Sequence, residues 1–292
     1  MDKKTDTQQA GAYASILLGA VLWGIMGLWT RGLMAGGLSS YSVALIRNFG
    51  GMLMLLVIFG ISDRQVFRVK KEHLKYFFGT GIISVLLFSA CYFSCQRICS
   101  LAVASVLLYT APAFVVLMST IFWREPLTKR KVAALLMTLL GCCMVCGVFA
   151  GGLSVSLLGF LLGLGAGFFY ALYSIFGRYA LKLYNSITVI VWTFIFAGIG
   201  SLVFLHPAEM AVALAQPKMC LQMLGLVGIS TVLPYIFYTR GLSRVEAGKA
   251  SIMASLEPVV ASLTGVLFFG ESLNILTVGG ILCILAGVYI LR

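Results

Sequence analysis

The stretch Ser251-Ile-Met-Ala-Ser-Leu-Glu-Pro-Val-Val-Ala-Ser-Leu-Thr-Gly-Val-Leu-Phe-Phe-Gly-Glu-Ser-Leu273 is an apolar run that is long enough to cross a bilayer. It carries one carboxylate, Glu257, near its middle, and Pro258 follows directly. A charge in the hydrocarbon core costs at least about 2.5 kcal/mol on the insertion scale, so we expect Glu257 to have a role. The stretch from Ser105 to Leu127 repeats this plan, with Pro112 and then Glu125.

The composition excludes a water-soluble protein. Apolar residues make up 61% of the 292 residues, charged residues only 10%, and the mean hydropathy is +1.04. A soluble domain carries about 25% charged residues, so this chain cannot cover a water-facing surface. The net charge is +12, and the basic residues that produce it lie in short loops between apolar runs. It therefore indicates orientation in a membrane and not nucleic-acid binding.

Ten apolar segments are long enough to span a bilayer, with no soluble domain between them. If the N-terminus is cytoplasmic, 17 of the 21 basic residues lie on the cytoplasmic side, three lie outside, and Arg47 lies within a span. This bias predicts a multi-pass protein of the cell membrane (plasma or inner membrane) with both termini in the cytoplasm. The expected spans are 12–30, 41–61, 76–96, 100–122, 130–149, 157–179, 188–205, 220–239, 248–269 and 274–291.

The two halves of the sequence resemble each other at a shift of 146 residues. Without a gap, 12 of the 52 positions from 92 to 143 are identical to their counterparts. The pairs include Pro112 with Pro258 and Glu125 with Glu271. We expect two units, 1–150 and 151–292, of five spans each. Because five is odd, the second unit would cross the membrane in the opposite orientation, which is an inverted-topology repeat.

The pattern resembles the EamA-type family of the drug/metabolite transporter superfamily. The residues that carry this resemblance are Tyr109-Thr-Ala-Pro112 with Arg124-Glu-Pro-Leu127, and Leu256-Glu-Pro-Val259 with Phe269-Gly-Glu-Ser-Leu273. The first half departs slightly, with Trp-Arg-Glu-Pro where the second has the more family-like Phe-Gly-Glu-Ser. The resemblance implies a ten-helix carrier with a central cavity between the halves, and it favours export of amino acids, related metabolites or toxic compounds.

Two charged residues within the spans are candidates for the transport site. Glu257 is either a protonatable group in the cavity, which would carry protons or bind a substrate amine, or a structural carboxylate between helices. Arg47 could bind a substrate carboxylate or pair with Glu257, whereas its shallow position slightly favours extension to the outer headgroups. If both faced the cavity, they would match the two ends of a zwitterion.

Aromatic side chains within the spans are candidates to line a cavity for an organic solute, although any of them could simply pack against helices or lipid. With the two charged residues, the expected substrate-binding set is Trp23, Arg47, Tyr92, Tyr109, Tyr170, Trp192, Tyr238 and Glu257.

Prolines within the spans remove backbone hydrogen bonds, and we expect hinges at Pro112, Pro234 and Pro258. Ordinary tolerance of proline in membrane helices is the alternative. We expect Glu125 and Glu271 to begin the helices that follow them, with a gating role as the lesser alternative.

Small residues and cysteines point mainly to packing. Gly159, Gly163, Gly167 and Ala171 lie four apart, which favours close helix contacts within the molecule over a dimer interface, and both a monomer and a homodimer stay open. The eight cysteines lack zinc-site spacing and accompanying histidines, so we expect buried thiols, no metal and no cofactor.

The sequence therefore predicts an all-α secondary transporter of small organic metabolites such as amino acids, working by alternating access around a midplane cavity. The drive would be a substrate or proton gradient, because no ATP-binding motif is found. The alternatives are a channel or a gradient-independent facilitator and, less favoured, an intramembrane enzyme. A channel pore would carry rings of polar or charged groups, and an enzyme would need a nucleophile–base pair or metal ligands at membrane depth.

Overall fold

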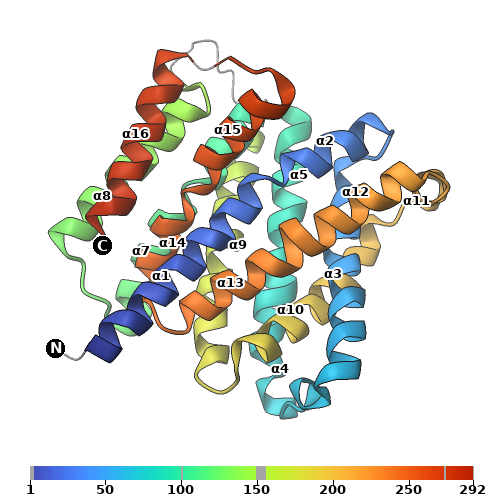
Figure 1. Ribbon diagram of the computed structural model, residues 1–292, viewed down its shortest axis with the longest axis horizontal. Coiled ribbons are helices and arrows are strands. Elements are labelled where there is room, and N and C mark those ends of the chain that lie inside the picture. Colours follow the sequence, from blue (N-terminus) through green and yellow to red (C-terminus); the bar gives the residue numbers. More distant parts are fainter. Residues whose placement is uncertain (1–2, 100, 149–155, 273, 292) are drawn as a thin grey trace.

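A computed structural model describes residues 3–99, 101–148, 156–272 and 274–291 as a helical bundle, and these residues contain no β-strand (Figure 1). The boundary expected between residues 150 and 151 lies outside the described residues. The helices of the first half are α1 (Lys3–Gly24), α2 (Gly27–Ala35), α3 (Ser40–Ser62), α4 (Leu74–Phe78), α5 (Leu87–Ile98), α6 (Leu101–Leu108), α7 (Ala111–Trp123) and α8 (Lys129–Val145).

The second half has the same kinds of elements, but the single helix α9 stands where the first half has α1 and α2, and a short helix, α11, is added. A π-helical segment precedes α5 in the first half (η3, Gly79–Leu86) and α13 in the second (η6, Gly228–Val232). The helices of the second half are α9 (Leu157–Leu181), α10 (Ser186–Gly200), α11 (Pro207–Leu214), α12 (Pro217–Val227), α13 (Leu233–Leu242), α14 (Ala247–Ala254), α15 (Glu257–Phe269) and α16 (Ile275–Ile290).

Eight helical stretches in the described part of the chain are long and apolar enough to cross a membrane, which establishes a multi-pass membrane protein. Several are built from two helices in sequence, such as α6 with α7 and α14 with α15. The two other expected segments, 130–149 and 274–291, correspond to α8 and α16, which are shorter at 17 and 16 residues.

Short polar side chains fix where several helices begin. Ser39, Thr128, Ser156, Asn185 and Asn274 each accept a hydrogen bond from the backbone N–H three residues later. Such an N-cap satisfies a donor that has no partner within the helix. Thr128 and Asn274 are 146 residues apart, so α8 and α16 begin at matching positions.

The structure repeats at the 146-residue shift found in the sequence. When 146 is added to the residue numbers that bound α6, the result is the bounds of α14, and the same addition to α7 gives the bounds of α15. Beyond α7, the backbone N–H of Glu125 donates to the carbonyl of Ser119, and beyond α15 that of Glu271 donates to Gly265. These two bonds are also related by 146 residues, so the repeat extends to the conformation of the helix ends.

The halves pack across each other. Helix α1 packs against α13, α14 and α15 of the second half, and α9 packs against α5, α6 and α7 of the first. Helices α8 and α16 lie side by side at one edge of the bundle (Figure 1). There a Cβ on Gly141 would come within 2.6 Å of the Gly280 carbonyl, so only glycine permits this approach.

The glycine-rich face of α9 is used for packing within the molecule, as the favoured interpretation expected. A Cβ on Gly163 would lie 2.7 Å from that of Leu107, and one on Gly167 would lie 2.8 Å from the Leu107 carbonyl. The α9 backbone therefore approaches the end of α6. In the same way Gly24 of α1 faces the beginning of α15, where a Cβ would lie 2.8 Å from the Glu257 carbonyl.

Candidate functional site

An aromatic cluster lies where α1, α9 and α13 meet. The ring centroid of Trp23 lies 5.4 Å from that of Tyr235, 5.4 Å from that of Tyr238 and 6.5 Å from that of Tyr170. Tyr170 in turn contacts the ring of Phe88, with the centroids 5.3 Å apart. The crossed packing of the halves thus gathers aromatic side chains from both of them.

Hydroxyl pairs hold this cluster in place. The Tyr173 hydroxyl lies 2.6 Å from Thr239 Oγ1, and the Tyr238 hydroxyl lies 2.8 Å from Ser174 Oγ. All four residues are buried. A buried hydroxyl without a partner would be costly, so these pairs fix the positions of the rings.

Arg47 of α3 is directed into the bundle. Its guanidinium lies over the ring of Phe88, 5.7 Å from the centroid, and Nη1 approaches Met26 Sδ at 3.9 Å. It also interacts with the hydroxyl of Tyr235. Extension to the outer headgroups, the slightly favoured expectation, is therefore not the conformation found. Nε of Arg47 is buried and has no hydrogen-bond partner among the described residues.

Glu257 is the first residue of α15 and follows a break in the span. Helix α14 ends at Ala254, so the α15 N-terminus, with its free N–H groups, lies at Glu257 inside the span. A carboxylate is stabilised at such an end. The Glu257 carboxylate lies within electrostatic range of Arg47. No ion pair within 4.0 Å joins these two among the described contacts.

Two small cavities lie on either side of Tyr170. One has a volume of about 10 Å³ and lies among the aromatic cluster and Ser174, and the other, of about 20 Å³, is lined by Glu257, Tyr109 and Ser255. About 10–15 Å³ of such volume holds one water molecule. Neither of these two cavities can hold an organic solute in this conformation.

The structure brings together seven of the eight expected binding residues. Tyr109 and Tyr92 both lie within electrostatic range of Glu257, and the Tyr92 hydroxyl is 3.3 Å from Ser105 Oγ. Trp192 lies apart from this group, because its ring stacks on Phe77, 5.9 Å away, in a separate cluster with Phe196.

The expected hinge prolines lie at the beginnings of helices. Pro112 is the second residue of α7, Pro258 the second of α15, and Pro234 the second of α13, directly after η6. We expected each to kink a continuous helix by removing a hydrogen bond. Instead, Pro112 and Pro258 stand in a first turn, where the N–H has no intrahelical partner in any residue, and the preceding helix has already ended.

Sequence reasoning did not place Phe88, Ser174 and Ser255 in the site. A phenylalanine or serine within an apolar span has no distinguishing pattern, and only packing reveals its role. The repeat gave one usable signal, because it matched Ser105 with Ser251. Ser105 contacts Tyr92, and Ser251 lines the cavity beside Glu257.

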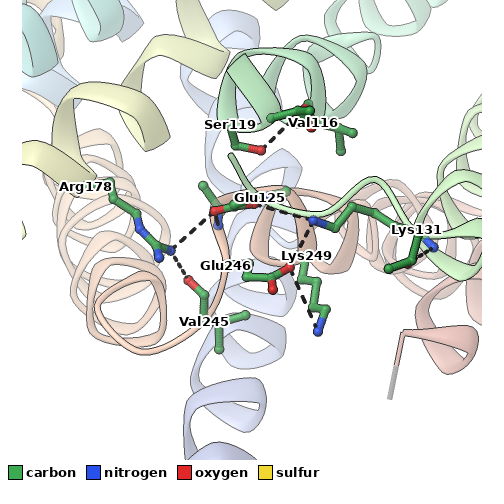
Figure 2. A network of polar contacts seen from close by, with 12 residues as sticks. Val116, Ser119, Glu125, Lys131, Arg178, Val245, Glu246 and Lys249 are labelled. Carbon is green, nitrogen blue, oxygen red and sulfur yellow. Dashed lines mark hydrogen bonds and ion pairs between the residues drawn. The ribbon is translucent and has the colours of Figure 1, made fainter. Parts of the chain in front are cut away.

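Glu125 does not begin the helix that follows it, contrary to expectation. Thr128 caps α8, whereas the Glu125 carboxylate accepts hydrogen bonds from the N–H groups of Ala247 (2.9 Å) and Gly248 (3.3 Å) at the beginning of α14. Lys131 and Arg178 approach the same carboxylate at 3.5 and 3.7 Å (Figure 2). Glu271, its repeat counterpart, pairs with Arg31 at 2.6 Å, and Asn274 caps α16.

Within the described residues no group of three or more histidine, cysteine or acidic side chains could hold a metal ion. All eight cysteines are free thiols that are buried or partly buried.

The chain matches the EamA-like transporter family over residues 11–147 and 157–292. It is 28% identical to an uncharacterized transporter of Archaeoglobus fulgidus over 277 residues, and this aligned region covers 95% of this chain and 94% of that protein. It is 24% identical to a probable amino-acid metabolite efflux pump of Salmonella typhimurium over 64% of this chain and 66% of that protein. A solved structure with 18% identity has the same fold, with a TM-score of 0.81 over 96% of both chains.

Proposed function

Because the chain belongs to the EamA-like transporter family, we propose that it is a secondary transporter that moves small organic metabolites, such as amino acids, out of the cell by alternating access. In this proposal ten helices form two inverted five-helix units, 1–150 and 151–292, and both termini are cytoplasmic. The crossed packing of α1 and α9 and the matching bounds of α6 and α14 support the repeat. The distribution of basic residues supports the orientation.

The observation that carries this proposal is the position of two opposite charges beside the aromatic cluster. Arg47 and Glu257 come from different halves, lie within electrostatic range and form no direct pair. A buried guanidinium with an unpaired donor favours a ligand anion, and Glu257 favours a ligand cation or a proton. A zwitterion such as an amino acid offers both charges, and the rings of Trp23 and Tyr170 would surround its side chain.

The amino-acid class has a second support in the name of the Salmonella relative, a probable amino-acid metabolite efflux pump. In this proposal Tyr92, Tyr109 and Tyr238 complete the binding surface, and Trp192 would contribute only by packing. The segments at Pro112 and Pro258 would act as hinges because α7 and α15 begin there after separate helices, and Pro234 would act as one because the π-helical η6 passes into α13 there.

The experiment is flux in proteoliposomes. A panel of radiolabelled amino acids is tested with and without an imposed pH gradient, for the wild type, Glu257→Gln and the control Glu72→Gln, whose carboxylate is exposed in a short 3₁₀-helix. We expect saturable flux that follows the gradient in the wild type and control and is lost in Glu257→Gln. Flux that is independent of the gradient and intact in Glu257→Gln would make the protein a facilitator with a structural Glu257. Non-saturable flux would indicate a channel.

A further inference from the structure

At one end of the bundle an arginine of the second half contacts residues of the first half. Arg178, near the end of α9, lies 3.7 Å from Glu125, which follows α7. The same guanidinium donates to the Val245 carbonyl at 2.6 Å (Figure 2). It also lies over the ring of Trp123, 5.9 Å from its centroid. We name the contact of Arg178 with Glu125 and Trp123 the Glu125 latch.

A second arginine makes the corresponding contact elsewhere in the molecule. Arg31 of α2 lies 2.6 Å from Glu271, which follows α15. Its guanidinium lies over the ring of Phe269, 4.3 Å from the centroid. We name the contact of Arg31 with Glu271 and Phe269 the Glu271 latch.

The two latches are related by the internal repeat. Trp123 and Phe269 are 146 residues apart, and so are Glu125 and Glu271. In each latch an arginine from the first span of one half contacts an aromatic ring and a carboxylate at the end of the α7 or α15 helix of the other half. Because the Glu125 latch and the Glu271 latch join equivalent helices of the two halves, we expect them to have the same function.

The surroundings of the two latches differ. The Glu125 side chain is 5% exposed and also accepts from the N-terminus of α14, while Lys131 joins it to Glu246. The Glu271 side chain is 48% exposed, and Arg31 is its one ion-pair partner among the described residues. At the positions equivalent to Lys131 and Glu246 the sequence has Thr277 and Ser100, which carry no charge.

We propose that these latches are the alternating gates of the transporter: the Glu271 latch closes the site toward the outside and the Glu125 latch closes it toward the cytoplasm. This inference rests on the proposed function and on the proposed orientation. Both latches are formed in this conformation, in which the two cavities beside Tyr170 are too small for an organic solute. Because the Glu271 latch is exposed and has fewer partners, the resting protein opens more readily to the outside.

The test measures water access to the site from each side of the membrane and needs no knowledge of the substrate. Ser255, which lines the cavity beside Glu257, is replaced by cysteine in a variant whose eight native cysteines are alanine. A membrane-impermeant thiol reagent is applied to intact cells and to inverted vesicles. We expect Arg31→Gln to raise the labelling rate from outside by about threefold. Arg178→Gln should raise it from the cytoplasmic side on the order of tenfold.

Matched controls separate the latches from a general loss of positive charge. Arg97→Gln and Arg240→Gln remove exposed arginines that form no ion pair with a described residue, and both should leave labelling unchanged. The double variant Arg31→Glu with Glu271→Arg should move labelling back toward the parent rate, because Arg31 is the one ion-pair partner of Glu271 among the described residues. If the cysteine-free protein does not fold, amide hydrogen exchange of α14 and α15 in the native-cysteine variants gives the same comparison.

Two results would overturn the proposal that the latches are gates. One is an unchanged labelling rate in both arginine variants, and the other is a labelling rate that increases from the same side of the membrane in both. Flux of the amino-acid panel through the wild type is measured in parallel. Labelling that rises on opposite sides without any wild-type flux would reject the proposed function and leave the latches standing. Normal flux with unchanged labelling would reject the latches as gates and leave the proposed function standing.

Discussion

Arg124 and Gly270 lie 146 residues apart, and both end a membrane helix in the left-handed conformation, with φ angles of 53° and 67°. Among the described residues, Arg124 is the one residue other than glycine with positive φ. The first half therefore has the same left-handed backbone as the second half at this position, but with an arginine in place of the glycine that adopts it without strain. The departure of Trp-Arg-Glu-Pro from Phe-Gly-Glu-Ser changes the side chain and not the fold.

This pair predicts opposite effects on stability. Arg124→Gly relieves a left-handed arginine and should stabilise the protein by about 1 kcal/mol, whereas Gly270→Ala should destabilise it by about 1 kcal/mol. Thermal unfolding in detergent measures both. A Cβ on Gly270 meets no atom within 4 Å, so steric overlap does not complicate the comparison. A destabilised Arg124→Gly variant would show that the arginine side chain makes a contribution larger than the backbone strain.

The sequence alone could predict the membrane class and the repeat, because these depend on composition and spacing. It could not predict that Glu125 binds the N-terminus of α14, because that contact joins residues more than 120 positions apart. It also could not separate Trp192 from Trp23. Both are tryptophans within apolar spans, and only the crossed packing of α1 against α13 and α14 brings Trp23 to the site.

The two repeat-related carboxylates should differ in their contribution to stability. Glu125→Gln removes a buried charge that Lys131 approaches at 3.5 Å, and it should lower the free energy of unfolding by about 3 kcal/mol. Glu271→Gln removes half of an exposed pair and should cost at most about 1 kcal/mol. Thermal unfolding of both variants in the same detergent gives the comparison. Equal losses would mean that burial does not distinguish the two latches.

The tryptophans provide a direct test of the candidate site. Trp23→Phe should reduce substrate flux by about tenfold, because its ring contacts Tyr170, Tyr235 and Tyr238 around the cavity. Trp192→Phe should leave flux near the wild-type rate, because its ring packs against Phe77 outside this group. Flux is normalised to folded protein, measured by size-exclusion chromatography. A larger flux loss in Trp192→Phe than in Trp23→Phe would place the transport site elsewhere.

Glu209 of α11 gives a pH-dependent prediction outside the membrane spans. Its carboxylate accepts hydrogen bonds from the Ser39 backbone N–H at 2.8 Å and from Ser39 Oγ at 2.9 Å, and Ser39 is the N-cap of α3. Burial acts to raise the pKa of Glu209, but hydrogen bonds from Ser42 and Ser39, with the nearby His206, outweigh it and lower the pKa below its usual value.

A lowered pKa in the folded state means that the ionised carboxylate stabilises the fold. This contribution is fully present above the pKa of the unfolded chain, about 4.3, and is lost as the pH falls through the lower folded-state pKa. Glu209→Gln should therefore melt at a lower temperature than the wild type at pH 7, and the difference should shrink as the pH falls below about 4. Melting curves of both proteins across this range measure it, with Glu72→Gln as the exposed control. A difference that stays constant with pH would show that the carboxylate contributes by shape alone, since a neutral glutamine cannot follow the titration of Glu209.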